Sequence, residues 1–504
     1  MPVHDTDTAR PSFMEASAKF LHNLFQPATD HELTAWLFVK GLALVYFAAF
    51  LSLAVQIEGL AGSGGILPFH ELLQRGLAAE GRAAWVDLPT LFWLDSSDVA
   101  LQGAALAGAL LALLLLLGWG RQRLILILLF VLYLSLYHAG QVFMNFQWDY
   151  LLLECGFLAI FLAGAPTRLV VLLYHWLLFR LRFLSGFSKL ASGDPSWSGF
   201  TTLKYYFETQ PLPHVGSWYA HQLPEPLLKA GVGFTFFTEL IVPFFIFLPR
   251  PFRIFAAAVT ILMQLTIIAT SNHNFINLLT ILLCLFLLDD RIVGKVVPQR
   301  IRERRAALAP APLAGATLSV TTGASALLIL ALSLSTMFPL LTGRPLPPAL
   351  HAFASIGPRY GIGNSYHVFP NMQTERQELQ IAGSYDGVYW ERYVFRYKPG
   401  ALDHAPAFIV PHQPRLDWMM WFVPTQQGDV AYWFAPFLDA LAANKPAVTG
   451  LLADNPFAGK APPRYLQVLA YRYHFTTGEE RARSGNWWKA EYLGEFPDVP
   501  PRRP

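Results

Sequence analysis

Long apolar runs fill the first two thirds of the chain. A membrane-spanning helix needs about 20 mostly apolar residues, and nine runs reach or approach that length. They are residues 33–57, 100–118, 124–139, 150–164, 169–184, 227–248, 254–270, 275–288 and 316–341. The fourth and eighth runs are short, and the fifth carries His175, Arg180 and Arg182. The pattern therefore predicts a polytopic α-helical membrane domain over residues 33–341, with about eight or nine spans.

A different pattern begins at about residue 342, where prolines, aromatic residues and charges become frequent. In ERQELQIAGSYDGVYWERYVFRYKPG, apolar and polar residues alternate up to Asp386-Gly387, and an aromatic-rich run follows. This pattern predicts a β-hairpin with an Asp-Gly turn. Residues 464–475 alternate in the same way, whereas residues 432–453 have helical spacing. We therefore expect a β-rich α+β domain over residues 342–504.

Lysine and arginine residues indicate the orientation of the spans, because short cytoplasmic loops are enriched in them. With a cytoplasmic tail at residues 1–32, that side receives Arg121, Arg123, Arg168, Arg250, Arg253 and a basic cluster at 291–305. An odd number of spans then places residues 342–504 outside the cytoplasm. Arg180 and Arg182 do not fit this distribution, which indicates a tilted span or arginines that face a polar interior.

Composition agrees with a membrane protein. Hydrophobic residues make up 54% of the 504 residues and charged residues only 14%, against about 25% in soluble domains. The net charge of +3 is too small to predict a nucleic-acid partner. Both cysteines lie inside apolar runs, and the sequence has no metal-ligand, Walker A, Rossmann or Gly-x-Ser-x-Gly motif. We therefore expect neither a metal nor a cofactor, and we expect no cleavable signal peptide.

Polar residues gather on the predicted extracytoplasmic side of the membrane domain. Ionisable groups at membrane depth are costly, so a set of them usually lines a cavity or pathway. The alternative is that they satisfy one another's hydrogen bonds. The predicted membrane polar cluster consists of His138, Gln141, Asn145, Asp149, Glu154, Asp194, Glu208, Asn272, His273 and Asn274. Glu239, Gln264 and Asn277 continue this pattern in later runs.

The stretch SGFSKLASGDPSW follows the fifth run and contains the first catalytic candidate, Lys189. A lysine that is desolvated near the membrane can act as a base, or it can extend its ammonium group to the interface. Asp194 is either its ion-pair partner or a turn former or helix N-cap. His221 is the second candidate, but it follows Trp218 and Tyr219, so an interfacial aromatic belt explains it equally.

The stretch PHQPRLDWMMWF supplies the candidates for protein binding. Arg415, Asp417, Trp418 and Trp421 combine the residue types that anchor protein interfaces. The alternatives are that the tryptophans fill the core of the C-terminal domain or dock it on the membrane. An aromatic hairpin such as IAGSYDGVYW also leaves open a glycan or lipid head group as the ligand of this domain.

Several long stretches together resemble the lipase maturation factor family. They include GQVFMNFQWDYLLLECGFLA, SGFSKLASGDPSWSGFTTLKYYFETQPLPHVGSWYAHQLP, SNHNFINLLTILLCLFLLDD and NPFAGKAPPRYLQVLAYRYHFT. The resemblance implies a multi-span protein of the animal endoplasmic reticulum that assists the folding of secreted lipases, with its C-terminal domain on the lumenal side. Without a Lys-Asp-Glu-Leu-type sequence or sequons, we expect a relative in the bacterial inner membrane. Its expected partners are membrane lipids and an exported client protein such as a lipase.

The membrane part is also distantly similar to vitamin K-dependent γ-carboxylases. The carboxylases have two consecutive lysines at this place, followed by an aspartate and a tryptophan. SGFSKLASGDPSW keeps one of the lysines, as Lys189, and has Asp194 and Trp197 after it, but Ser188 replaces the other lysine. This resemblance implies a membrane enzyme that acts on a quinol or lipid-like substrate with Lys189 as the base. The hypotheses are therefore a maturation factor, such an enzyme, and a scaffold subunit without activity.

Overall fold

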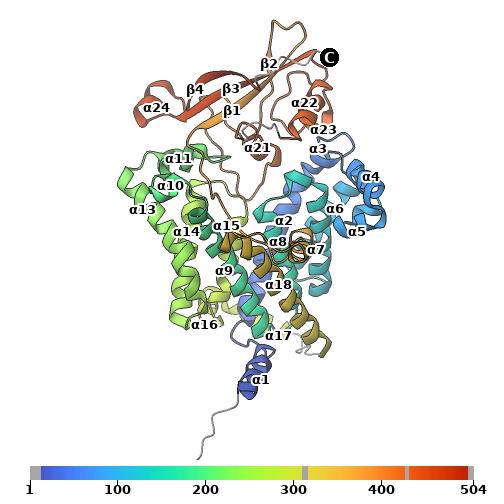
Figure 1. The fold of residues 1–504 in the computed structure, drawn as a ribbon, viewed down its shortest axis with the longest axis vertical. Helices are drawn as coiled ribbons and strands as arrows, with labels where there is room; N and C mark the ends of the chain where they lie inside the picture. Colours follow the sequence, from blue (N-terminus) through green and yellow to red (C-terminus); the bar gives the residue numbers. More distant parts are fainter. Residues whose placement is uncertain (1–12, 309–315, 426–430, 498–504) are drawn as a thin grey trace, which may run out of the picture.

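The computed structural model describes residues 13–308, 316–425 and 431–497. A helical bundle forms one layer, and a small β-sheet domain lies on one end of it (Figure 1). Parts of the predicted tail and of the C-terminal domain, residues 1–12 and 498–504, lie outside the described residues. The two-part architecture that the sequence predicts is confirmed.

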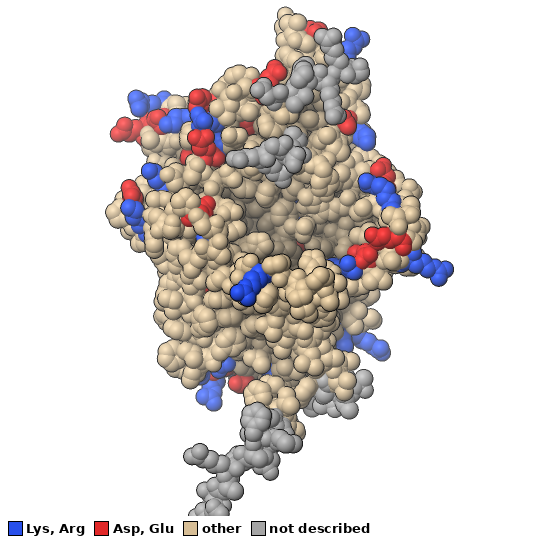
Figure 2. All heavy atoms as spheres, in the orientation of Figure 1, with Lys and Arg blue, Asp and Glu red and all other residues tan. Residues whose placement is uncertain are grey.

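Seven helices are long and apolar enough to cross a membrane within the described ranges. They are α2 (Glu32–Ala54), α6 (Asp98–Leu117), α7 (Gln122–Ala139), α9 (Arg168–Ala191), α13 (Glu225–Phe236) with its continuations η5 (Phe237–Ile241) and η6 (Val242–Phe247), α14 (Arg250–Thr270) and α18 (Ala316–Thr342). Figure 2 shows few charged side chains on the lower half of the bundle, between the charged groups at mid-height and those at its lower end. That distribution suits a bundle surrounded by lipid.

All nine predicted runs are helical, but two of them are shorter than a span. The fourth run forms α8 (Gln147–Ala159), and the eighth forms α15 (Ile276–Cys284) followed by η7 (Leu285–Leu287). Both are packed inside the bundle, and most of their residues are buried. A helix enclosed by other helices does not have to match the thickness of the bilayer, which explains their length.

The predicted end of the fifth run, at residue 184, is wrong. Helix α9 continues to Ala191, so Ser185 and Lys189 belong to it. The sequence has no strong helix breaker before Gly193, whose φ of +68° suits glycine. The first seven residues of SGFSKLASGDPSW therefore form the last two turns of a long helix.

Shorter helices cover both ends of the bundle. They are α1 (Phe13–Leu24), α3 (Ile57–Ala61), α4 (Phe69–Glu80), η1 (Gly81–Ala83), α5 (Ala84–Asp87), η2 (Leu91–Trp93), η3 (Gln141–Phe143), η4 (Ile160–Leu162), α10 (Pro195–Ser198), α11 (Thr202–Thr209), α12 (Val215–His221), α16 (Asp290–Val296), α17 (Gln299–Leu308), α19 (Pro348–Ala354) and α20 (Ile356–Tyr360). Helices α1, α16 and α17 lie at the end opposite the sheet, whereas α3, α10 and α11 lie near it (Figure 1).

The C-terminal domain contains an antiparallel sheet with strand order β2-β1-β3-β4. The strands are β1 (Arg376–Ser384), β2 (Glu391–Arg392), β3 (Tyr465–Phe475) and β4 (Trp488–Glu495). The helices are α21 (Arg415–Met420), α22 (Phe434–Ala442), α23 (Pro446–Thr449) and α24 (Gly478–Ser484). The strand near residues 464–475 and the helices in 432–453 are confirmed. The predicted hairpin is confirmed only in part, because its second strand is limited to Glu391–Arg392 and Asp386-Gly387 lies within the loop of residues 385–390. The sequence analysis did not identify β4, because only Trp488 at its start is buried.

The bundle and the C-terminal domain share their cores at the junction. Trp418 of α21 packs into the core of the bundle, whereas Leu60 and Phe143 from the bundle side pack into the core of the C-terminal domain. Burial of large apolar side chains on both sides stabilises the contact by the hydrophobic effect. The C-terminal domain is therefore docked firmly on the bundle.

Candidate functional site

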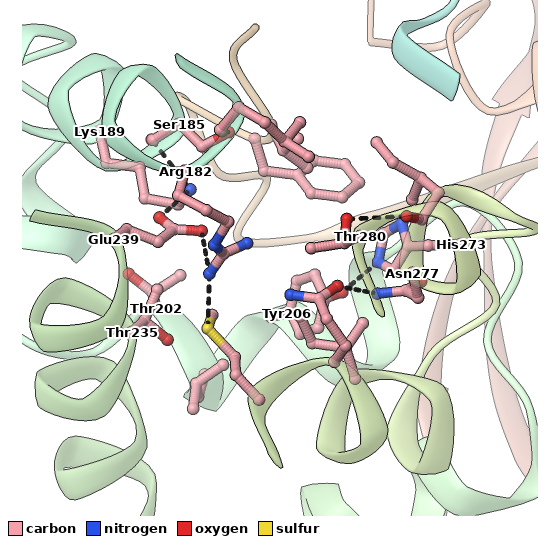
Figure 3. Close-up of a pocket in the computed structure, with 18 of the residues that line it drawn as sticks. Arg182, Ser185, Lys189, Thr202, Tyr206, Thr235, Glu239, His273, Asn277 and Thr280 are labelled. Atoms are coloured by element: carbon pink, nitrogen blue, oxygen red, sulfur yellow. Dashed lines mark hydrogen bonds and ion pairs between the residues drawn. The ribbon is translucent and has the colours of Figure 1, made fainter. Parts of the chain in front are cut away.

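A pocket of about 120 Å³ lies between α9, α11, η5, α14 and α15, close to the C-terminal domain. Figure 3 shows the side chains that line it. Its polar and charged lining consists of Arg182, Ser185, Lys189, Thr202, Tyr206, Thr235, Glu239, Gln264, His273, Asn277 and Thr280. Residues 368, 369 and 372, which precede β1, complete the wall. The pocket therefore combines residues of the bundle with residues that follow the last membrane-spanning helix.

An ion pair forms one side of the pocket. Lys189 Nζ lies 2.8 Å from Glu239 Oε2 and donates a hydrogen bond of 3.0 Å to the carbonyl oxygen of Ser185, one turn earlier in α9. The same ammonium group lies 5.2 Å from the ring centroid of Trp197, within cation–π range. Lys189 is 4% exposed, so its charge is held inside the protein. The alternative in which it extends to the interface is wrong.

Glu239 reaches the ion pair because of two local features. It lies in the π-helical turn η5, a type of turn that often marks a functional position. Gly186 of α9 faces this turn, and a Cβ added there would lie 2.7 Å from Glu239 Cβ. Glycine at position 186 therefore allows α9 and η5 to approach closely enough for the carboxylate to meet Lys189.

Arg182 adds a second buried cation on the same face of α9. Its Nη2 lies 3.4 Å from Glu239 Oε1 and 2.7 Å from the sulfur of Met263, and its Nε has no hydrogen-bond partner. The amide of Asn277 donates a 2.8 Å hydrogen bond to Gln264 Oε1. Gln264 Nε2 and Asn277 Oδ1 remain without partners although both residues are buried. Buried polar groups normally have partners, so these atoms indicate a binding function.

Tyr206 and His273 form the opposite wall (Figure 3). The Tyr206 hydroxyl lies 2.5 Å from His273 Nε2 and donates a 3.0 Å hydrogen bond to Ser271 Oγ. Burial, with smaller contributions from His214 and Lys189, lowers the pKa of His273 to about 4. His273 is therefore neutral at physiological pH, and its Nε2–H can donate to the Tyr206 hydroxyl oxygen, whose own proton points to Ser271.

Lys189 and His221, the two predicted catalytic residues, lie in different pockets. His221 lines a second pocket of about 400 Å³, where its Nε2 lies 3.7 Å from Glu208 Oε2. Burial lowers the pKa of His221, and the Glu208 carboxylate opposes this shift. The two residues do not form one catalytic pair, and a catalytic role for either stays a prediction. Nowhere in the described chain are three His, Cys, Asp or Glu side chains grouped so that they could hold a metal ion.

Asp194 is an N-cap, one of the alternatives that the sequence left open. Its Oδ1 accepts a 2.8 Å hydrogen bond from the backbone N–H of Ser196 at the start of α10. Its Oδ2 accepts another of 2.8 Å from the N–H of Met372. The partner of Lys189 is Glu239 instead.

Much of the predicted membrane polar cluster fixes the C-terminal part of the chain to the bundle. Asp149 forms two contacts of 2.7 Å with the guanidinium group of Arg415, and it accepts a 2.7 Å hydrogen bond from Tyr133. Glu154 pairs with Arg180 and accepts a 2.9 Å hydrogen bond from Tyr366. Arg180 therefore faces a polar interior, one of the two explanations given for its position in the sequence.

Further cluster residues make similar contacts. Asn272 donates a 2.8 Å hydrogen bond to the carbonyl oxygen of Ala407, and Asn274 donates one of 3.0 Å to Gln413 Oε1. The remaining contacts are those of His138 with the Arg359 carbonyl, Gln141 with the Leu67 carbonyl, Asn145 with the Tyr137 hydroxyl, and Glu208 with the Phe475 N–H. Among the candidates that the sequence predicts, only Lys189 and His273 line the pocket with the ion pair.

The PHQPRLDWMMWF candidates for protein binding are not free on the surface, and Trp418 fills a core, one of the alternatives that the sequence left open. Arg415, Asp417 and Trp418 are buried, and Trp421 is half-buried. Trp418 packs edge-on against Trp148 with centroids 5.0 Å apart, and Trp421 Nε1 donates a 2.7 Å hydrogen bond to the Thr209 carbonyl. Their role in client binding stays a prediction, but in this structure they dock the C-terminal domain on the bundle.

The way in which the residues of the pocket combine was not predicted from the sequence. Glu239 was identified only as one of the polar residues, without Lys189 as its partner, and Tyr206 was not a candidate. The spacing of Arg182, Ser185 and Lys189 was informative, because residues three, four and seven apart share one face of a helix. That pattern extends across the predicted end of the fifth run, so the wrong helix boundary concealed it.

The fold and the pocket define a polytopic membrane protein with buried charges beneath a docked β-rich domain. Family models for the lipase maturation factor transmembrane domain and the lipase maturation factor C-terminal domain match residues 33–295 and 362–498. The chain belongs to the lipase maturation factor family. The similarity to γ-carboxylases and the bacterial membrane stay predictions.

Individual relatives agree with this assignment. Lipase maturation factor 2 of Xenopus laevis is 32% identical, over 93% of this chain and 82% of the frog protein. Lipase maturation factor 2 of Gallus gallus is 34% identical, over 91% and 80% of the two chains. Lipase maturation factor 1 of Bos taurus is 34% identical, over 94% and 90%. No solved structure matches the chain.

Proposed function

We propose that this protein is a membrane-embedded maturation factor that assists the folding or assembly of exported proteins, with lipases as the first candidate clients. Membership of the family and the names of its relatives support this role. The single structural observation that carries the proposal is an exposed apolar loop on the C-terminal domain.

The loop between β1 and β2 forms the end of the C-terminal domain farthest from the bundle (Figure 1). We call Tyr385, Val388, Tyr389 and Trp390 the aromatic tip. Val388 is 71% exposed and Tyr389 is 80% exposed. Exposed apolar groups of this kind mark interaction sites, and tyrosine and tryptophan are common anchors of protein interfaces. The aromatic tip therefore suits contact with apolar surface on a partly folded client.

The aromatic tip is also held in a fixed conformation. Asp386 Oδ1 accepts hydrogen bonds of 2.8 Å and 2.9 Å from the N–H groups of Val388 and Tyr389. These hydrogen bonds lower the pKa of Asp386, because they stabilise its charged form. The Tyr385 hydroxyl donates a 2.7 Å hydrogen bond to the Ala461 carbonyl. A loop that is ordered before binding loses less conformational entropy when a client binds.

The proposed topology places the aromatic tip on the extracytoplasmic side, where exported clients fold. Support comes from the basic residues of α16 and α17, such as Arg291 and Arg300, at the end of the bundle opposite the sheet (Figure 1). Basic residues favour the cytoplasmic side. The bacterial inner membrane is the proposed location.

The test is co-expression of the full-length protein with an exported lipase in a host that has no maturation factor of its own. The double variant Val388→Ser/Tyr389→Ser is compared with Tyr492→Ser, a change at a position on β4 that is 55% exposed. We expect the double variant to lower the specific activity of exported lipase by about tenfold, because interface anchors contribute about 1–2 kcal/mol or more. The Tyr492 variant should act like the wild type.

Two results would contradict the proposal. One is lipase activity with the double variant that equals the wild-type value at equal membrane abundance. The other is wild-type protein that leaves lipase activity at the level of a host without it.

A further inference from the structure

The pocket around Lys189 contains an unbalanced buried charge. Among the described residues that line it, Arg182 and Lys189 are cations and Glu239 is the one anion. All three side chains are at most 8% exposed. The His273 imidazole adds no charge, because its pKa is about 4. A buried charge without a partner is strongly unfavourable, so the surplus positive charge indicates an anionic ligand.

Hydrogen-bond donors without partners lie beside this charge. Arg182 Nε and Gln264 Nε2 are buried and have no acceptor. Figure 3 shows the Arg182 guanidinium group in the centre, between the Lys189–Glu239 pair and the Tyr206–His273 wall. A guanidinium group presents several donors in one plane and suits the two oxygens of a carboxylate. The donors therefore favour a planar oxyanion.

The rest of the pocket is apolar. The aliphatic, thioether and aromatic side chains in its lining are Leu181, Trp197, Leu203, Met263, Ile267, Ile276, Val368, Phe369 and Met372. Several of them lie on α14 and α15 within the bundle. A ligand that suits both parts of the pocket has one negative charge at its head and hydrocarbon next to it.

We propose that this pocket binds the carboxylate group of a long-chain fatty acid. The carboxylate contacts Arg182 and Gln264 and neutralises the surplus charge, and the first methylene groups contact the apolar wall. A volume of about 120 Å³ holds a head group and the start of a chain, so the remaining chain extends beyond the pocket. A neutral alcohol would leave the surplus positive charge of the pocket in place. A doubly charged phosphate would turn that surplus into a net negative charge.

The experiment measures binding of radiolabelled oleate to the full-length protein in detergent, with oleyl alcohol and oleoyl lysophosphatidic acid as competitors. We expect unlabelled oleate to displace the radiolabelled oleate at a concentration at least tenfold lower than oleyl alcohol or oleoyl lysophosphatidic acid requires. Arg182→Gln should weaken oleate binding by at least about tenfold, as expected for the loss of a charged hydrogen bond. Lys229→Gln is the matched control, because it removes a cation whose partner, Glu225, lies on the surface of α13.

A second variant has the opposite expected effect. Glu239→Gln raises the charge of the lining, so folded Glu239→Gln protein should bind oleate more tightly than the wild type. This result keeps the test decisive if Arg182→Gln fails to fold. Equal competition by oleyl alcohol, preferred binding of lysophosphatidic acid, or unchanged binding by Arg182→Gln would each overturn the proposal.

Discussion

Two buried charge clusters near the junction of the bundle and the C-terminal domain differ in their net charge. In the Asp149–Arg415 cluster, one acid meets one base through two contacts of 2.7 Å, and Tyr133 donates a further hydrogen bond. In the pocket, the carboxylate of Glu239 serves both Lys189, at 2.8 Å, and Arg182, at 3.4 Å. The first cluster is neutral, and the second carries a surplus positive charge.

The difference separates a structural role from a binding role. Removing charges from water costs several kcal/mol per ion, and a neutral pair with good geometry recovers most of it. Nε lacks a partner in both Arg415 and Arg182, so this feature alone does not distinguish the clusters. Only the second cluster combines a surplus charge with an adjacent pocket. The first therefore holds the domains together, and the second has space and charge for a ligand.

The largest expected effect comes from breaking the neutral cluster with Arg415→Ala. This change leaves Asp149 buried without its cation, which typically costs about 3–5 kcal/mol. Thermal unfolding of the purified protein in detergent should show a large fall in melting temperature, and protease should release the C-terminal domain more readily.

Arg472→Ala is the control, because Arg472 pairs with Glu375 and Glu491 on the surface. Pairs of this kind contribute about 0–1 kcal/mol. If both variants unfold at the same temperature, the Asp149–Arg415 pair does not hold the domains together.

The sequence predicts the bundle well because a membrane span leaves a long apolar run that is independent of context. Every run from residue 33 to 341 is helical, and the chain reverses direction in the loop that contains Asp386-Gly387, as local turn chemistry predicts. Strand β4 was missed because its one buried side chain, Trp488, gives no alternating pattern. Its place depends on pairing with β3, which is a non-local contact.

The pairing of charges could not be predicted from spacing. Glu239 lies 50 residues from Lys189, and Arg415 lies 266 residues from Asp149. Asp194 was the nearer acid to Lys189 in the sequence, but its carboxylate caps α10 instead. Likewise, the tryptophans of PHQPRLDWMMWF resemble interface anchors whether the surface they meet belongs to another protein or to the same chain.

Lys189→Met tests the second cluster and is expected to have a smaller effect. The change removes one charged hydrogen bond, which contributes about 2 kcal/mol, but it also leaves Arg182 and Glu239 as a neutral pair, which offsets part of that loss. The melting temperature should fall less than for Arg415→Ala. Lipase activity in co-expression should remain within about twofold of the wild-type value, because the aromatic tip contacts the client. Loss of maturation by a folded Lys189→Met protein would instead assign a chemical role to this lysine.

The smallest expected effect is a pH dependence on the Tyr206–His273 wall. In the folded protein the pKa of His273 is about 4, against an ordinary value of 6.5, so between these values the unfolded chain binds a proton that the folded protein does not. Stability from this group is therefore present above pH 6.5 and is lost as the pH falls towards 4. From pH 7 to 5.5 the loss is about 1 kcal/mol. The His273→Gln variant keeps a hydrogen-bonding side chain beside the Tyr206 hydroxyl but does not titrate, so its melting temperature should fall less than that of the wild type over this range. If the melting temperatures of the two proteins depend on pH equally, protonation of the His273 imidazole does not reduce the free energy of unfolding. This wall of the pocket would then not be shielded from water.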